Sequence, residues 1–287
     1  MNIVAIKNRD KLLDALEFTK LHHKADINVI KLCDKLLYIN ESSAIFGIIA
    51  ENEHGTIVGS LLLIKQGFLV LEKNEMAIFN MSSWVILKDY RGVLALQMLS
   101  FTLKLLKNSC ITNFTPNLSV IKILQAFKFS NLNAKRIVIP NFLSFPFYLI
   151  EYSQVKISFS SIDEINTRIH PWSRKFSSDN DAIFLTINLG KDKVVLGGVV
   201  GVNSKRLFGF NFNISYFSIY WISDDFLFSK MANKTIFVIR RFLKVNYLTI
   251  STISDYYSRL GFVKNENFFI YNNPNFIIDP IGSEIFL

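Results

Sequence analysis

The chain has 287 residues, half of them hydrophobic and 19% charged, so it can bury a full core and is not an intrinsically disordered protein. Its net charge of +9 fits either a lysine-rich surface or an acidic ligand such as a phosphorylated cofactor. The basic residues occur only in short groups, without interleaved aromatics, zinc-finger spacing or an RNP pattern, so we expect no nucleic-acid partner.

The cysteines, histidines and apolar runs indicate which compartment and which cofactors to expect. Cys33 and Cys110 form no C-x-x-C pair, which predicts buried free thiols in a reducing compartment. The four histidines show no metal-ligand spacing, so we expect no metal. The N-terminus lacks the apolar run of a signal peptide, and no stretch approaches roughly 18 uncharged apolar residues. We therefore expect a cytoplasmic protein without membrane insertion.

The first third of the chain alternates between helical and strand patterns. Residues 4–6 suggest a strand, and Asp10 is a plausible N-cap for an amphipathic helix over residues 11–22, with a second helix over residues 26–37. Residues 43–52, 56–64 and 75–87 then predict an antiparallel meander, whose first turn contains Gly55.

The most informative stretch follows this meander. The apolar strand ends at residue 87, residues 88–92 (Lys-Asp-Tyr-Arg-Gly) break the pattern, and residues 93–107 predict an apolar helix. Free backbone N–H groups and the positive end of a helix dipole would then lie just beyond a strand end, which favours an anion. A strand at residues 110–114 and a short helix at residues 119–127 repeat the order, and residues 136–140 predict a further strand.

Residues 86–92 (Ile-Leu-Lys-Asp-Tyr-Arg-Gly) resemble the entry to the acyl-CoA pyrophosphate loop of the GCN5-related N-acetyltransferases. The residues at 117, 120, 124, 127 and 129 keep the spacing of that family's Asn-x-x-Ala…Tyr…Leu-Gly-Phe helix. The resemblance covers roughly residues 40 to 140 and has departures. Leu94 and Leu96 stand at the family's Gly and Gly/Ala positions, Leu124 stands where a Tyr often acts as general acid, and Lys128 replaces a Gly.

The resemblance implies acetyl-CoA as co-substrate and assigns its contacts. The pyrophosphate would take main-chain N–H groups from Gly92, Val93, Leu94, Ala95 and Leu96, and the pantetheine arm would lie along main-chain groups at Trp84, Ile86 and Leu87. Arg91 is either a phosphate contact or a solvated turn residue. Asn117 is a candidate helix cap or cofactor contact. Glu75 is the candidate base.

The second half of the sequence repeats this order. Asp163 is the expected N-cap of a short helix at residues 164–170. Residues 182–189 and 194–202 predict a hairpin, residues 208–223 further strands, and residues 226–244 a helix capped by Asp224 or Asp225. A strand at 247–250, a short helix at 255–260 and a strand at 268–271 follow. Residues 256–262 (Tyr-Tyr-Ser-Arg-Leu-Gly-Phe) resemble the family's Tyr-x-x-Leu-Gly-Phe helix end, which puts Tyr257 in the general-acid position.

The expected fold class is therefore α/β with largely antiparallel sheets, in two acetyltransferase-like domains in tandem. The first, residues 1–150, would carry the cofactor turn, and the second, residues 151–287, would be degenerate. The resemblance implies an acyl-CoA-dependent N-acyltransferase acting on a small amine, such as an amino sugar or a nucleotide-linked amino sugar. Two alternatives stay open: a non-catalytic binding or scaffold protein of this fold, and an aminoacyl transferase like the doubled peptidoglycan enzymes.

Overall fold

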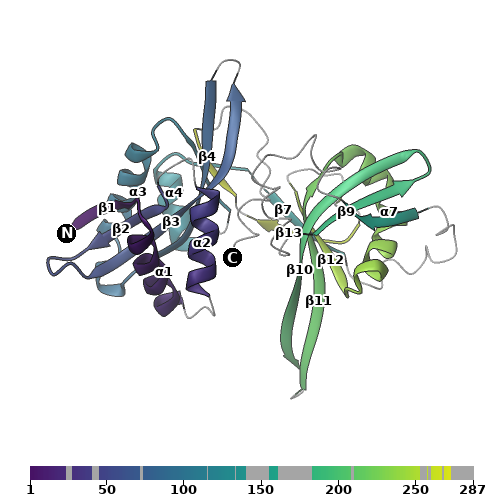
Figure 1. Cartoon of the computed structure of the whole chain (residues 1–287), viewed down its shortest axis with the longest axis horizontal. Coiled ribbons are helices and arrows are strands. Elements are labelled where there is room, and N and C mark those ends of the chain that lie inside the picture. Colours follow the sequence, from purple (N-terminus) through teal and green to yellow (C-terminus); the bar gives the residue numbers. More distant parts are fainter. Residues whose placement is uncertain are drawn as a thin grey trace. The chain divides into compact units, whose positions relative to one another are not determined.

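The computed structural model describes residues 1–23, 28–40, 45–71, 74–114, 116–132, 134–139, 155–160, 183–207, 210–252, 257, 260–266 and 268–272. The chain forms two compact units, each built around a mixed, mostly antiparallel sheet of seven strands (Figure 1). This confirms the expected fold class. Among the described residues, no helix combines the length and the apolar character needed to cross a membrane.

The sheet of the first unit has the strand order β1-β2-β3-β4-β5-β14-β6, and only β4 and β5 pair in parallel. Its strands are β1 (Asn2–Ile6), β2 (Gly47–Glu51), β3 (Ile57–Leu71), β4 (Asn74–Ile86), β5 (Cys110–Asn113), β6 (Ser130–Asn131) and β14 (Phe269–Tyr271). Its helices are α1 (Arg9–His23), α2 (Val29–Ile39), the 3-10 turn η1 (Lys88–Tyr90), α3 (Val93–Leu105) and α4 (Leu118–Ala126). The predicted meander, the strand–turn–helix stretch and the second strand–helix pair are thus all present.

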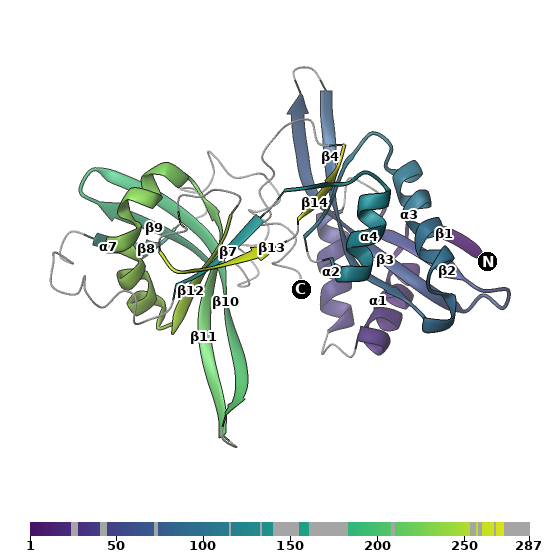
Figure 2. The same cartoon turned by 180° about the vertical axis from the view of Figure 1, so that it is seen from behind.

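The helices of the first unit cover opposite faces of its sheet, as Figures 1 and 2 show from the two sides. On one face, the Thr19 hydroxyl of α1 lies 3.0 Å from the Ser60 hydroxyl of β3. On the other face, Leu94 and Met98 of α3 pack in a buried cluster with Leu61 of β3. The two helix pairs therefore enclose the sheet between an α1/α2 layer and an α3/α4 layer.

Asparagine side chains cap the N-termini of three of these helices. Asn8 Oδ1 accepts a hydrogen bond from the Lys11 N–H at 2.9 Å, so Asn8 caps α1, and the expected cap Asp10 lies in the first helical turn instead. Asn28 caps α2 in the same way, and Asn117 caps α4 by accepting from the Val120 N–H. An Asn oxygen satisfies an N–H that the helix itself leaves without an acceptor.

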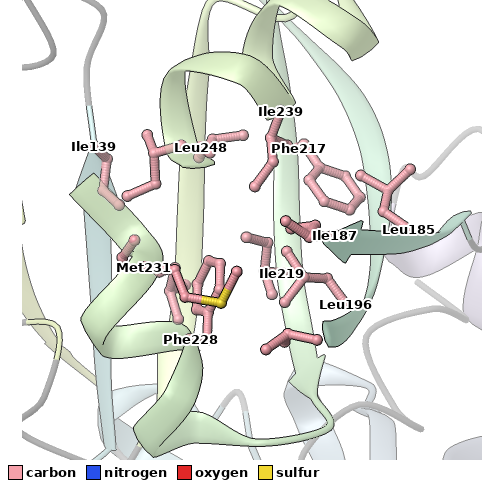
Figure 3. Close-up of a cluster of buried hydrophobic side chains, with 14 of the residues drawn as sticks. Ile139, Leu185, Ile187, Leu196, Phe217, Ile219, Phe228, Met231, Ile239 and Leu248 are labelled. Atoms are coloured by element: carbon pink, nitrogen blue, oxygen red, sulfur yellow. The ribbon is translucent and has the colours of Figure 1, made fainter. Parts of the chain in front are cut away.

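The sheet of the second unit has the order β13-β7-β12-β11-β10-β9-β8. Its strands are β7 (Ala134–Ile139), β8 (Val155–Phe159), β9 (Ile183–Leu189), β10 (Asp192–Leu207), β11 (Phe210–Ile222), β12 (Tyr247–Thr252) and β13 (Phe262–Glu266), and its long helix is α7 (Asp225–Leu243). Phe228, Met231 and Ile239 of α7 pack against Phe217 and Leu248 of the sheet, and Ile139 of β7 joins the same core (Figure 3).

The two units exchange one strand each. β7 pairs with β12 and β13 of the second sheet, whereas β14 pairs with β5 and β6 of the first. We had expected residues 136–140 to close the first half and residues 268–271 to close the second. Local order in the sequence cannot reveal this exchange, because only the pairing partner of each strand differs.

Two further expectations lie outside the described residues. These are the helix at residues 164–170 with its cap Asp163, and most of the short helix at 255–260, of which the structure describes Tyr257 and Leu260.

Candidate functional site

The turn between β4 and α3 has a backbone that only glycine adopts easily. The Leu87 N–H still pairs with the Val58 oxygen at 2.9 Å, and η1 then carries the chain to Arg91. Gly92 follows with φ 89° and ψ −102°, and it is the N-cap residue of α3. A residue with a Cβ is strained at this φ, so glycine lets the chain reverse into the helix at this point.

The N-terminus of α3 is left without an internal cap. No side chain caps it, its first turn holds no acidic residue, and the first bond along the helix runs from the Leu96 N–H to the Gly92 oxygen at 3.3 Å. Within the described part of the chain, no acceptor binds the N–H groups of Val93, Leu94 and Ala95. Three free donors and the positive end of the dipole therefore remain available to an anion.

A cavity of about 360 Å³ opens at this helix N-terminus. Elements from both faces of the sheet contribute to it: α1, the end of β4, the turn into α3, and the start of α4. Its lining residues among those described are His22, Trp84, Val85, Ile86, Arg91, Gly92, Ala95, Asn117, Ser119, Val120 and Ile123.

The cavity lies where β4 separates from β5. The parallel pairing of these strands spans only three residue pairs and ends at Asn80 with Thr112, although β4 continues to Ile86. The pairing of β4 with β3 also shifts register here, and Ser83 adopts a positive φ of 49°. Within the described ranges, the last residues of β4 thus have no partner strand on the β5 side, which leaves main-chain groups beside the cavity.

One buried donor in the cavity lining has no acceptor. The indole Nε1 of Trp84 is shielded from solvent and has no hydrogen-bond partner among the described residues. Leaving such a group unpaired costs about 1–3 kcal/mol, so a ligand that offers an acceptor would recover this cost.

Arg91 is fixed at the rim of the cavity through its own strand. Its Nε donates to the Ile86 carbonyl oxygen at 3.2 Å, and the residue is exposed. This bond ties the turn to the end of β4 and leaves the two terminal guanidinium nitrogens for an anion. Contact with a phosphate stays a prediction.

Asn117 combines the two roles considered from the sequence. Its Oδ1 accepts from the Val120 N–H at 3.0 Å, which confirms the cap of α4, and the residue also lines the cavity. Its contact with a cofactor stays a prediction.

The leucines that replace family glycines do not fill the cavity. Leu94 is buried in the core between α3 and the sheet, and Leu96 is 42% exposed; neither belongs to the lining. Val93 is exposed, and Leu87 is partly buried against the same core. Of these four residues, Val93 and Leu94 have N–H groups without an acceptor among the described residues. The Leu96 N–H bonds to the Gly92 oxygen and the Leu87 N–H to the Val58 oxygen, so the predicted N–H contact from Leu96 is wrong and Leu87 has no free N–H.

The two candidate catalytic residues lie apart from this constellation. Glu75 is the second residue of β4, whereas Trp84 and Ile86 lie at its end, so about 30 Å of extended strand separates Glu75 from the cavity. Tyr257 is fully buried in the core of the second unit. Its hydroxyl donates to Asp225, with the carboxylate Oδ1 at 2.7 Å and the carbonyl oxygen at 2.9 Å. Their catalytic roles stay predictions.

Sequence reasoning did not name two sets of lining residues, although the family resemblance implies that the two helices after the first strand wall the acceptor site. His22 comes from the end of α1, and Ser119, Val120 and Ile123 come from α4. The apolar periodicity of α4 was the only available signal, whereas nothing near His22 marks it. Cys110 of β5 is excluded as a nucleophile, because burial raises the pKa of its thiol to about 12.

No family model and no curated protein matches the sequence, but solved structures match the fold. The chain is similar to a GCN5-related N-acetyltransferase from Anabaena variabilis, with a TM-score of 0.60 and 8% identity over 94% of this chain and 72% of that one. It is also similar to Saccharomyces cerevisiae N-myristoyltransferase with bound myristoyl-CoA, with a TM-score of 0.54 and 7% identity over 94% of this chain and 82% of that one. A putative acetyltransferase from Pyrococcus horikoshii matches with a TM-score of 0.54 and 9% identity over 95% of this chain and 89% of that one. At such low identity these likenesses establish the fold alone, and the fold is the one expected from residues 86–129.

Proposed function

We propose that the chain is an acyl-CoA-dependent N-acyltransferase whose first unit binds the acyl donor, with acetyl-CoA as the first donor to test. The observation that carries this proposal is the uncapped N-terminus of α3, which faces a cavity and has no acidic residue in its first turn. A helix start with three free N–H donors is suited to a diphosphate. The nearby Arg91 adds a positive charge.

The rest of the cavity suits the remainder of such a donor. A pantetheine arm carries two amide groups in an extended chain, and the free edge of β4 at Trp84, Val85 and Ile86 offers main-chain partners for amides. The unpaired indole N–H of Trp84 would be satisfied by a carbonyl oxygen of the donor. Val120 and Ile123 of α4 supply an apolar wall.

The reaction then needs little covalent chemistry from the protein. The amine nitrogen attacks the thioester carbon, a C–N bond forms, the C–S bond breaks, and the CoA thiolate takes up the proton lost by the nitrogen. Holding the thioester next to the amine supplies much of the acceleration. Amino sugars and nucleotide-linked amino sugars are the first acceptors to test. The net charge of +9 favours the nucleotide-linked ones, because their phosphates are acidic.

One observation favours a second candidate, a binding protein without turnover. Leu124, at the position where the family often has a tyrosine acid, is fully buried in the core of the first unit and has no proton to give. A chain that binds acyl-CoA tightly yet transfers nothing to any amine would fit this alternative.

Isothermal titration with CoA, acetyl-CoA and longer acyl-CoAs tests the proposal, followed by an acyl-transfer assay over an amine panel. Gly92→Pro should abolish binding, because proline fixes φ near −65° where the turn needs 89°. Gly190→Pro is the matched control, since Gly190 has a φ of 62° in a hairpin turn of the second unit. Absence of binding to the unmodified chain, or equal binding by Gly92→Pro, would rule out this site.

A further inference from the structure

The cavity reaches both faces of the first sheet, and His22 lines it from the α1 face. The N–H donors of α3 and the residues of α4 belong to the opposite layer, because α3 and α4 pack on the face that holds Leu61. α1 packs on the other face through Thr19 and Ser60. The separation of β4 from β5 beyond Asn80 lets one cavity touch both layers.

This arrangement divides the lining into a donor side and an opposite side. A diphosphate bound at the start of α3 would leave the α1 side of the cavity for the acceptor amine that reacts with the thioester. His22 is the residue of α1 that lines this side within the described part of the chain.

We propose that His22 is the catalytic base that takes the proton from the acceptor amine. This inference rests on the proposed acyltransferase function and adds a residue to it. Among the described lining residues only His22 and Arg91 can ionise, and a guanidinium does not give up its proton. An imidazole is the side chain that exchanges protons near neutral pH, which a general base requires.

The surroundings of His22 suit a general base, which must be accessible to the substrate and must later release the proton it has taken up. Its ring packs on the Phe18 ring one turn earlier in α1, with centroids 4.6 Å apart and the planes inclined by 54°. Phe18 is buried, so it anchors the ring, whereas His22 itself is exposed. Among the described residues of β4, the turn into α3, and α4, the only charged side chain that shares the cavity is the Arg91 guanidinium.

The proton balance closes with this one residue. The neutral imidazole accepts the proton from the amine nitrogen as that nitrogen bonds to the thioester carbon. The C–S bond then breaks, and the resulting imidazolium gives the proton to the departing thiolate. No oxidant, reductant or metal enters this sequence, and His22 ends in the state in which it began.

The test compares His22→Gln with His54→Gln, which changes an exposed histidine in the β2–β3 turn. We expect His22→Gln to lower kcat by about 100-fold, within the range of general-base catalysis, with the Kd for acyl-CoA unchanged. His54→Gln should leave both values unchanged. His22→Ala should regain activity when free imidazole is added, an effect that a purely structural histidine would not give.

Three outcomes would overturn the proposal: an unchanged kcat in His22→Gln, a change confined to the KM for the amine, or no rescue by imidazole. The proposed function fails in a different way, through loss of acyl-CoA binding by the unmodified chain. The titration that measures the Kd therefore separates the two failures.

Discussion

The starts of α3 and α7 occupy the same place in the two units, yet their chemistry is opposite. Each helix follows the long fourth strand of its meander and leads into a strand that pairs with it in parallel, β5 in one unit and β12 in the other. α3 begins at Gly92 with no side-chain cap and no acid in its first turn. α7 begins at Asp224, whose carboxylate accepts from the Leu227 N–H at 2.8 Å, and Asp225 follows.

This difference shows that a doubled fold need not be a doubled site. A helix N-terminus can satisfy its donors internally, which stabilises the helix, or leave them for a ligand. At the start of α7, the Asp224 carboxylate satisfies one helix donor and the Asp225 carboxylate adds a second negative charge that repels a phosphate, whereas the start of α3 is open. The proposed anion site therefore belongs to the first unit. Substitutions that make the start of one helix resemble the start of the other test this proposal.

The largest effect should come from giving α3 the acid that α7 has. Val93 is the first residue of α3 and is 68% exposed, as Asp225 is the first residue of α7. A carboxylate about 6 Å from a diphosphate costs on the order of 2–3 kcal/mol at an intermediate dielectric, so Val93→Asp should weaken acyl-CoA binding about 100-fold. Titration calorimetry measures this loss.

The same change should stabilise the protein without ligand, because an acid near a helix N-terminus contributes about 0.3–1 kcal/mol. Affinity and stability thus move in opposite directions, which separates charge repulsion from misfolding. Val93→Asn is the neutral control of similar size and should bind nearly normally. Equal binding by Val93→Asp and the unmodified chain would mean that no anion lies at this turn.

The next effect concerns the cap of α7. Asp224→Ala removes the acceptor of the Leu227 N–H, so urea unfolding should show a loss of about 1 kcal/mol. Asp224→Asn keeps an oxygen acceptor without the charge and should recover most of this stability. Acyl-CoA binding should be unaffected in both variants. Weaker binding would show that the start of α7 contributes to the ligand site.

An effect of similar size on stability is expected from Tyr257→Phe. The variant removes a hydroxyl that donates to Asp225, so it should lower the free energy of unfolding by about 0.5–1.5 kcal/mol. Because this hydroxyl is already paired inside the second unit, kcat should stay unchanged. A large fall in kcat with normal stability would instead support the general-acid role that the resemblance implies.

The sequence predicted the elements well and their partners less well. The strand that ends at Ile86, the break through Gly92 and the helix from Val93 were all foreseen, because apolar periodicity and a glycine determine them locally. The exchange of β7 and β14 was not foreseen, because both strands have the expected sequence pattern and only their long-range pairing differs.

The same distinction applies to the site. The positions of Gly92 and Asn117 follow from local turn and cap chemistry, so both were found. His22 lines the cavity from α1, which packs on the face of the sheet opposite to α3, and no local sequence pattern encodes this long-range placement. Glu75 was predicted as the base because it lies on the strand that leads to the cofactor turn. That strand has 13 residues, so its first residues lie far from the cavity at its other end.

The smallest expected effect concerns Leu96, which stands at a family Gly/Ala position. Its side chain is 42% exposed and lies outside the cavity lining, so Leu96→Ala should change the Kd for acyl-CoA by less than about twofold and stability by less than about 0.5 kcal/mol. Ala95→Leu is the matched control, because it puts the same side chain one position earlier, where Ala95 lines the cavity. That variant should weaken binding by narrowing the approach to the N–H groups, with its fold checked by circular dichroism. If Leu96→Ala instead tightened binding strongly, the leucine would be obstructing the diphosphate, and the open start of α3 would not be a working anion site.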